Sequence, residues 1–226
     1  MRKIILLFFL SEIIVSSGKA QHAPFENWGV GLNAGLYGAG VQGATSLSPH
    51  FKWRAGFDYF TYRHSDAIEF EVIAAHNGHE ADAQAELRDT EITFPNFKTF
   101  VDYYPAQNAI FCLTGGFYAG TNRASTKGLI KNYRELTAAL GEKPELHYED
   151  IVITPDDDGS FDGKLHMGNT LKPYFGIGLG RTIPQNRVGF KFELGIVFQG
   201  KYALSSHNLN EAGHNWLNKM TEELDL

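Results

Sequence analysis

The chain is poor in several features that mark common protein classes. Its single cysteine, Cys112, cannot form an internal disulfide, and no histidine flanks it, so we expect an inert thiol. Lys and Arg number 20 against 26 Asp and Glu, and the net charge of −6 argues against general nucleic-acid binding. No run of eighteen apolar residues follows residue 20, so no transmembrane helix is expected. A barrel that crosses a membrane with short alternating strands is compatible with all three absences.

The first twenty residues have the pattern of a secretory signal. Two basic residues precede an apolar region that extends to residue 15, and Gly18 and Ala20 are small residues placed for signal-peptidase cleavage. Glu12 interrupts the apolar region, which leaves an uncleaved anchor as the alternative, although the run is short for a membrane span. We divide the chain into a signal peptide over residues 1–20, a β-barrel over 21–204 and a C-terminal loop or helical tail over 205–226.

Alternation with a period of two dominates the rest of the chain. The clearest stretch has an apolar face made of Val188, Phe190, Phe192, Leu194, Ile196 and Phe198. The residues between them include Lys191 and Glu193. Period two indicates a β-strand whose two faces meet different environments. An apolar face of this kind beside opposite charges is what a transmembrane barrel needs, with lipid outside and a packed polar lumen inside.

Seven such segments are expected, with short and long connections in alternation. They cover residues 27–35, 37–47, 51–62, 90–104, 109–122, 161–182 and 188–202. Pro95 is expected to interrupt the fourth segment. Short turns and long loops in strict alternation are typical of outer-membrane barrels, which have an even number of strands. The seven segments therefore lack an eighth, descending strand: the chain is truncated, the pairing near Gly35 differs, or another segment closes the barrel.

The alternation also predicts which charged side chains point into the lumen. These are Lys52, Arg54, Asp58, Lys98, Asp102, Lys172, Lys191 and Glu193. An eight-stranded barrel has room only for side chains or one small ligand, so a salt-bridge network that fills the lumen is favoured over a narrow polar path. On the opposite face, candidates for the aromatic girdles at the two lipid interfaces are Trp28, Trp53, Tyr59, Tyr103 and Phe198.

Two neighbouring stretches carry a family resemblance. KPYFGIGLGR at residues 172–181, followed by VGFKFELGIVFQG at 188–200, resembles a family of small Gram-negative outer-membrane proteins, and RAGFDY at 54–59 is similar to their second ascending strand. The family is similar to the OmpA-like and OmpW-like eight-stranded barrels. The resemblance implies an outer-membrane location, contact with lipid and lipopolysaccharide, and assembly by the barrel-assembly machinery. Family members usually close with a strand that ends in an aromatic residue, and this chain lacks one.

No catalytic or metal-binding constellation stands out. The acidic turn at residues 156–160 does not fit the spacing of an EF-hand, and His76 with His79 lacks further ligands. His207 with Ser205 or Ser206 is the best placed pair for a lipid A hydrolase. Helical spacing is also present at residues 129–140, in the second long loop, and at residues 210–226.

The sequence thus predicts an all-β, antiparallel up-and-down transmembrane β-barrel of the eight-stranded type, with a structural or surface-interaction role and no catalysis. We expect no catalytic residues, metal or cofactor, and a monomer that does not bind nucleic acid. Two alternatives remain: an outer-membrane lipid A-modifying hydrolase, and a secreted lipocalin-like barrel that binds an apolar ligand. In the lipocalin-like fold, the apolar face would point inward.

Overall fold

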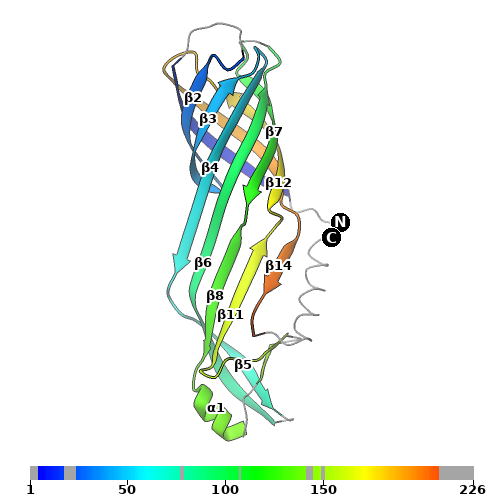
Figure 1. Ribbon diagram of the computed structural model, residues 1–226. Helices are drawn as coiled ribbons and strands as arrows, with labels where there is room; N and C mark the ends of the chain where they lie inside the picture. The colour runs from blue at the N-terminus through cyan, green and yellow to red at the C-terminus, as the bar shows by residue number, and fades with distance from the viewer. Residues whose placement is uncertain are drawn as a thin grey trace.

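The computed structural model describes residues 5–17, 24–76, 79–106, 108–140, 145–148 and 151–208, and the chain in these ranges is mostly β. The strands are β1 (Ile5–Ser17), β2 (Trp28–Gly35), β3 (Gly38–Ser46), β4 (Phe51–His64), β5 (Ile68–His76), β6 (His79–Tyr103), β7 (Phe111–Gly120), β8 (Arg123–Ile130), β9 (Glu145–Tyr148), β10 (Ile151–Ile153), β11 (Ser160–Met167), β12 (Leu171–Gly180), β13 (Val188–Phe198) and β14 (Tyr202–Ser205), with one helix, α1 (Tyr133–Leu140). The molecule is elongated (Figure 1), with tilted strands around one end and an open sheet that carries α1 at the other.

The antiparallel pairings of eight strands return to their starting point. The order is β1, β2, β3, β4, β6, β7, β12 and β13, and β13 pairs with β1 again. We call these eight the ring strands. Within the described residues, each ring strand therefore has a neighbour on both sides.

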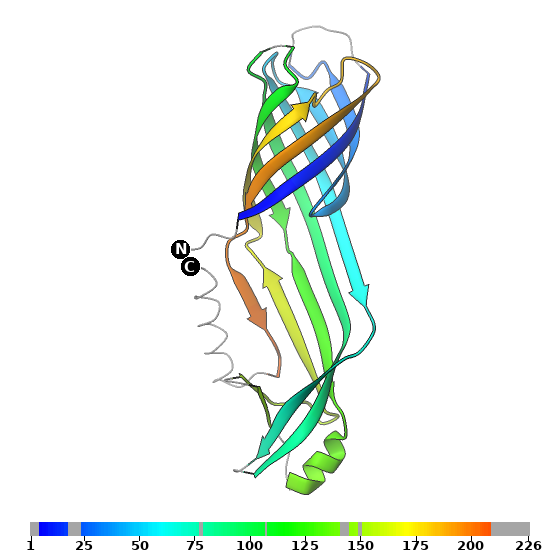
Figure 2. The ribbon, with the colours of Figure 1, turned by 180° about the vertical axis from the view of Figure 1, so that it is seen from behind.

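The eighth position is occupied by the segment that the sequence assigns to a signal. β1 pairs with β13 from Ile5↔Phe198 to Val15↔Val188, and with β2 from Ser11↔Ala34 to Ser17↔Trp28. Figure 2 shows β1, in dark blue, beside β13, in orange. β1 thus lies between β13 and β2, and the expected pairing near Gly35 is kept because Gly35 pairs with Gly38.

The expected interruption at Pro95 is wrong. β6 continues through Pro95, which pairs with Tyr59 of β4. On its other side, the ladder with β7 ends at Asn96↔Gly120 and the ladder with β8 begins at Thr93↔Arg123. Because no residue pairs with position 95 on that side, proline's missing N–H costs no ladder hydrogen bond there. The irregularity in β6 lies instead between Arg88 and Glu91.

The long connections are largely strands rather than loops. We call the part of the sheet outside the ring the extension: β5, β8, β9, β10, β11, β14 and the end of β6 that pairs with β5 and β8. The expected strand at 161–182 is divided into β11 and β12 near Gly168, whose φ is +83°. The helix starts at Tyr133, later than expected, because Leu129 belongs to β8. The expected helix at 210–226 lies outside the described residues.

The extension has a small apolar core of its own. It consists of Ala74, Ala83, Ala85, Ile130, Tyr133 and Phe161, with Leu87, Leu136 and Ile153 packed against it. This cluster fixes α1 against the β5–β6 hairpin. The extension is therefore a packed element that continues the ring strands β4 and β6, and not a set of independent loops.

Candidate membrane surface and buried polar interior

The outer face of the ring strands is apolar. On β4, Phe51, Trp53, Phe57 and Tyr59 are between 37% and 48% exposed, and on β13 Phe190 and Phe192 are 61% and 58% exposed. The same holds on neighbouring strands for Trp28, Val30, Leu32, Phe97, Val101, Tyr103, Phe111, Leu113, Phe117, Phe175, Ile177 and Leu179. Soluble monomers rarely expose an apolar surface that continues over so many strands. The five residues expected in the girdles, Trp28, Trp53, Tyr59, Tyr103 and Phe198, all lie on this face.

The other face of the same strands carries buried charge. Of the eight residues expected in the lumen, Arg54, Asp58, Lys98, Asp102, Lys172, Lys191 and Glu193 are buried, and Lys52 is half-buried. Exposed apolar and buried charged side chains thus alternate at Trp53–Arg54 and Phe57–Asp58 of β4 and from Phe190 to Glu193 of β13. An arrangement with the phenylalanines in a central core and the charges in water, as in the lipocalin-like alternative, does not occur in these strands.

Four of the buried charges form one network. Arg54 contacts Glu193, and its Nε lies 3.1 Å from Oδ2 of Asp102. The Lys191 Nζ lies 2.8 Å from Oδ2 of Asp102 and 3.0 Å from Oε2 of Glu193. The hydroxyl of Thr114 donates to Oδ1 of Asp102 at 2.6 Å. The residues come from β4, β6, β7 and β13, so the network connects four ring strands across the interior.

Two further polar groups lie in the interior. In the first, Asp58 accepts a hydrogen bond from Nδ2 of Asn33 at 2.7 Å and lies 2.9 Å from Nζ of Lys98. In the second, Nζ of Lys172 donates to Oδ1 of Asn96 at 3.1 Å and to the carbonyl of Gly120 at 2.6 Å.

Lys52 lies apart from these groups. Its Nζ donates to the carbonyl of Ser48 at 2.8 Å, in the turn between β3 and β4. The structure thus brings seven of the eight expected residues into the interior and leaves Lys52 at one rim.

Aromatic side chains fill the space between the polar groups. Phe100 and Tyr174 lie 4.8 Å apart between ring centroids, Tyr118 packs edge-on against both, and Tyr37 lies 4.8 Å from Tyr118. Arg54 lies over the ring of Phe100 at 4.7 Å. This aromatic cluster was missed among the expected site residues. The sequence pattern could have predicted an inward position for Phe100, since it stands between Lys98 and Asp102 in the inward phase of β6.

Glycine makes room for this cluster. A Cβ added to Gly195 would lie 2.3 Å from the Tyr174 hydroxyl oxygen, and one added to Gly176 would lie 2.4 Å from it. Both residues belong to strands that flank or carry Tyr174, and their missing side chains leave the space that its ring occupies. Mutually paired charges and packed aromatic rings thus fill the described interior.

The polarity of the two faces is reversed where the strands leave the ring. In the outward phase of β4, Tyr59 is followed by Thr61 and Arg63, and Arg63 forms an exposed ion pair of 2.9 Å with Glu91. The Arg63 guanidinium lowers the pKa of Glu91. In the inward phase, Asp58 is followed by Phe60, which packs on Phe94 at 5.5 Å between ring centroids. The outward side chains of β4 therefore change from apolar to polar between residues 59 and 61.

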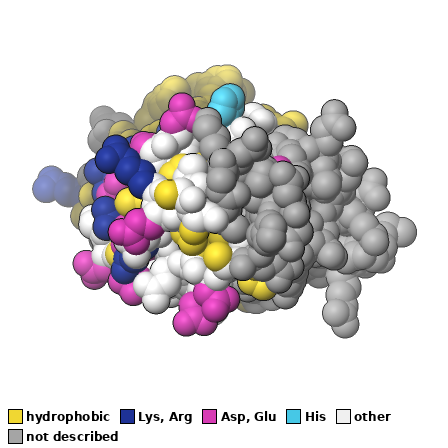
Figure 3. Space-filling view, turned by 90° about the horizontal axis from the view of Figure 1, so that it is seen from below, with side chains coloured by type: hydrophobic (Ala, Val, Ile, Leu, Met, Phe, Trp, Pro, Cys, Tyr) yellow, Lys and Arg dark blue, Asp and Glu magenta, His cyan; other side chains and the backbone are white. Residues whose placement is uncertain are grey.

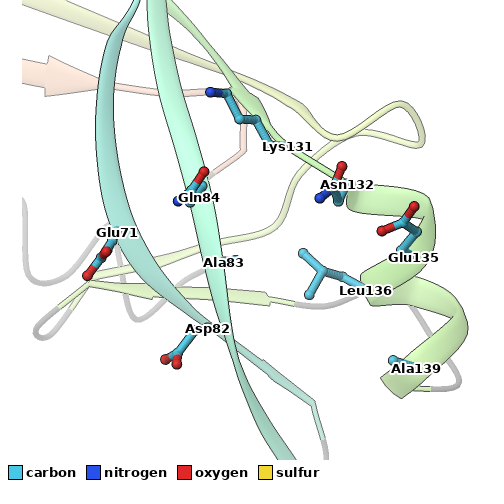
Figure 4. Close-up of a pocket in the computed structure, with 9 residues that line it drawn as sticks. All are labelled: Glu71, Asp82, Ala83, Gln84, Lys131, Asn132, Glu135, Leu136 and Ala139. Carbon is cyan, nitrogen blue, oxygen red and sulfur yellow. The ribbon is translucent and has the colours of Figure 1, made fainter.

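The far end of the extension is charged and hollowed. Figure 3, viewed from that end, shows acidic and basic side chains around its described surface. A pocket of about 610 Å³ lies between the β5–β6 hairpin and α1 (Figure 4), lined by Glu71, Asp82, Ala83, Gln84, Lys131, Asn132, Glu135, Leu136 and Ala139. Lys131 is engaged by Glu69, which lies outside the pocket lining.

The candidate hydrolase residues have other partners. The Ser205 hydroxyl donates to the Lys164 carbonyl, and the Ser206 hydroxyl accepts from the backbone N–H of Asn208. The backbone N–H of His207 donates to Asp162 at 2.8 Å. In the acidic turn, Asp158 accepts hydrogen bonds from the backbone and hydroxyl of Ser160. The described residues contain no group of three or more His, Cys, Asp or Glu side chains that could hold a metal ion.

In the described parts of the chain, no helix is long and apolar enough to cross a membrane. No protein-family model matches the chain, and no curated protein matches it. Two solved structures from Acinetobacter baumannii are similar to it. CarO2 is 13% identical, with 98% of this chain and 91% of that chain covered and a TM-score of 0.43. CarO is 14% identical, with 96% and 88% covered and a TM-score of 0.42.

Proposed function

We propose that the ring strands form a closed, eight-stranded transmembrane β-barrel in the outer membrane of a Gram-negative bacterium. The observation that supports this most directly is the alternation of exposed apolar and buried charged residues in one strand, as in Phe190, Lys191, Phe192 and Glu193. Lipid is the medium in which such an outer face is stable. The reversal after Tyr59 of β4 supports a membrane border at that level.

The proposed role is structural or interactive and involves no catalysis. Ion pairs among Arg54, Asp102, Lys191 and Glu193 connect the strands across the interior, and the aromatic cluster fills the space beside them. A filled interior favours a stable surface barrel over an open pore. The extension would then project from the membrane and present its charged end, with the pocket beneath α1, to the outside. We further propose a monomer that contacts lipid and lipopolysaccharide and is inserted by the barrel-assembly machinery.

Membrane fractionation with gel electrophoresis of unheated and boiled samples tests this proposal. A closed barrel resists detergent at room temperature and migrates faster before boiling than after it. We expect the chain in the outer-membrane fraction, with a shift in mobility on boiling. Recovery in the soluble periplasmic fraction without detergent, or one mobility in both samples, would contradict the proposal.

A further inference from the structure

The ring contains a position that its other seven strands cannot fill. Apart from β1, the partners of β2 and β13 are β3 and β12 respectively. Eleven residues of β13 and seven of β2 have partners in β1. Inside a bilayer, each backbone group without a partner costs several kcal/mol, so two facing open edges are not tolerated there. A strand at this position is therefore a requirement of the proposed barrel.

The register of β1 matches the two faces of its neighbours. Paired residues of antiparallel strands lie on the same face of the sheet. The outer face of β13 includes Val188, Phe190, Leu194, Ile196 and Phe198. Their partners in β1 are, in the same order, Val15, Ile13, Phe9, Leu7 and Ile5. Five apolar residues thus fall in the lipid-facing phase. A shift by one residue would leave mostly apolar residues in both phases but would move Glu12 into the lipid-facing phase, so Glu12 is the residue that distinguishes the two registers.

Glu12 holds an inward position in this register. It pairs with Lys191 of β13 and with Asn33 of β2, both of which are buried in the interior. Glu12, which is unusual in the apolar region of a signal peptide, thus has polar partners in both neighbouring strands.

From these observations we infer that residues 5–17 remain part of the protein in the outer membrane and form the eighth strand of the barrel. The segment acts as a built-in closing strand, whether or not it also directs export. This inference rests on the proposed barrel. It replaces the expectation that residues 1–20 are removed.

The N-terminus of the protein recovered from outer membranes decides the question. The full chain, expressed with a C-terminal tag, would be purified from the outer-membrane fraction, digested with trypsin and analysed by mass spectrometry. We expect the peptide of residues 4–19, between Lys3 and Lys19, and an intact mass that includes the complete 25.2 kDa chain. A protein that begins at Gln21 would overturn the inference. If that shortened protein still shifts on boiling, the barrel proposal stands without it.

A disulfide test checks the register in the membrane. Both variants carry Cys112→Ser, so that they contain no other thiol. The test variant has Ser11→Cys and Ala34→Cys, which are paired between β1 and β2. The control variant has Ser11→Cys and Val30→Cys, and Val30 lies on the same face of β2, four residues from Ala34. The Cβ atoms of paired residues are about 5 Å apart, whereas the two cysteines of the control variant are displaced from each other by about 13 Å along the strand direction. We expect loss of both free thiols after oxidation in the first variant only. Free thiols in both variants, with the mobility shift retained, would overturn the inference.

Discussion

The exposed face of β4 allows a sharp test of which medium surrounds the ring. Its outward residues Phe51, Trp53, Ala55, Phe57 and Tyr59 span nine residues, the length that a transmembrane strand needs, with Ala55 at the centre. Ala55→Arg places a cation at the membrane midplane with little change in packing, because the alanine side chain is small. Thr61→Arg is the matched control, since Thr61 lies six residues further along the same face, beyond the reversal of polarity.

At the midplane of a barrel, an outward Arg destabilises the fold by about 2–4 kcal/mol. Ala55→Arg should therefore lower the free energy of unfolding in lipid vesicles by that amount, measured by denaturant titration of tryptophan fluorescence. Thr61→Arg should change it by less than about 0.5 kcal/mol, as is usual for an exposed position in water. Equal small effects of both variants would refute the assignment of β4 to the membrane, because a water-exposed strand accepts arginine at either position.

The remaining predictions concern the interior and the extension. Asp102→Asn removes the carboxylate that Arg54 and Lys191 share and should destabilise the barrel by about 3–5 kcal/mol. Glu91→Gln, in the exposed pair with Arg63, should destabilise it by less than about 1 kcal/mol. Denaturant unfolding in lipid vesicles measures both free-energy changes. Gly195→Ala should reduce the band that shifts on boiling, and Tyr174→Leu in the same chain should restore part of it, because the added Cβ meets the Tyr174 ring. The backbone N–H of His207 lowers the pKa of Asp162, so this contact stabilises the fold above the unfolded pKa of about 3.9 and is lost as the pH falls through the folded value. The protection factor of the His207 amide against hydrogen exchange, measured relative to the intrinsic rate at each pH, should fall over that acidic range, and Asp162→Asn should remove the dependence. His207→Ala should leave lipid A profiles unaltered, and an altered profile would revive the hydrolase alternative.

The parts of the fold that the sequence predicts well are those where alternation has a physical cause. In β4 and β13, each side chain faces one of two unlike media, so residue type reports the face directly. That is why the placement of Arg54, Asp102, Lys191 and Glu193 on one face could be read before the structure was known.

The strand β1 was missed for the opposite reason. Both phases of its sequence are largely apolar, since Leu6, Phe8 and Leu10 alternate with Leu7 and Phe9, so the segment has no clear alternation and resembles a signal. Only its pairing with β2 and β13 distinguishes the two interpretations. Pairing is a long-range property that local patterns do not contain.

The strands of the extension were missed because they expose polar side chains and have no apolar outer face. Arg123, Lys127 and Lys164 occupy the outward phase of β8 and β11, and small residues such as Gly128 and Gly163 lie between the larger ones. Such segments have the composition of loops. The apolar core under α1 comes from short side chains, Ala74, Ala83 and Ala85, which give little hydrophobic signal in the sequence.

β6 is one unbroken strand of 25 residues that belongs to the ring at one end and to the extension at the other. Its irregularity between Arg88 and Glu91 lies within the extension, so the strand passes from the ring into the extension without a break. In the proposed barrel, a pull applied to the β5–β6 hairpin would reach Lys98 and Asp102 as strain along the strand. The projecting sheet and the ion pairs beneath it would therefore respond to mechanical load as one body.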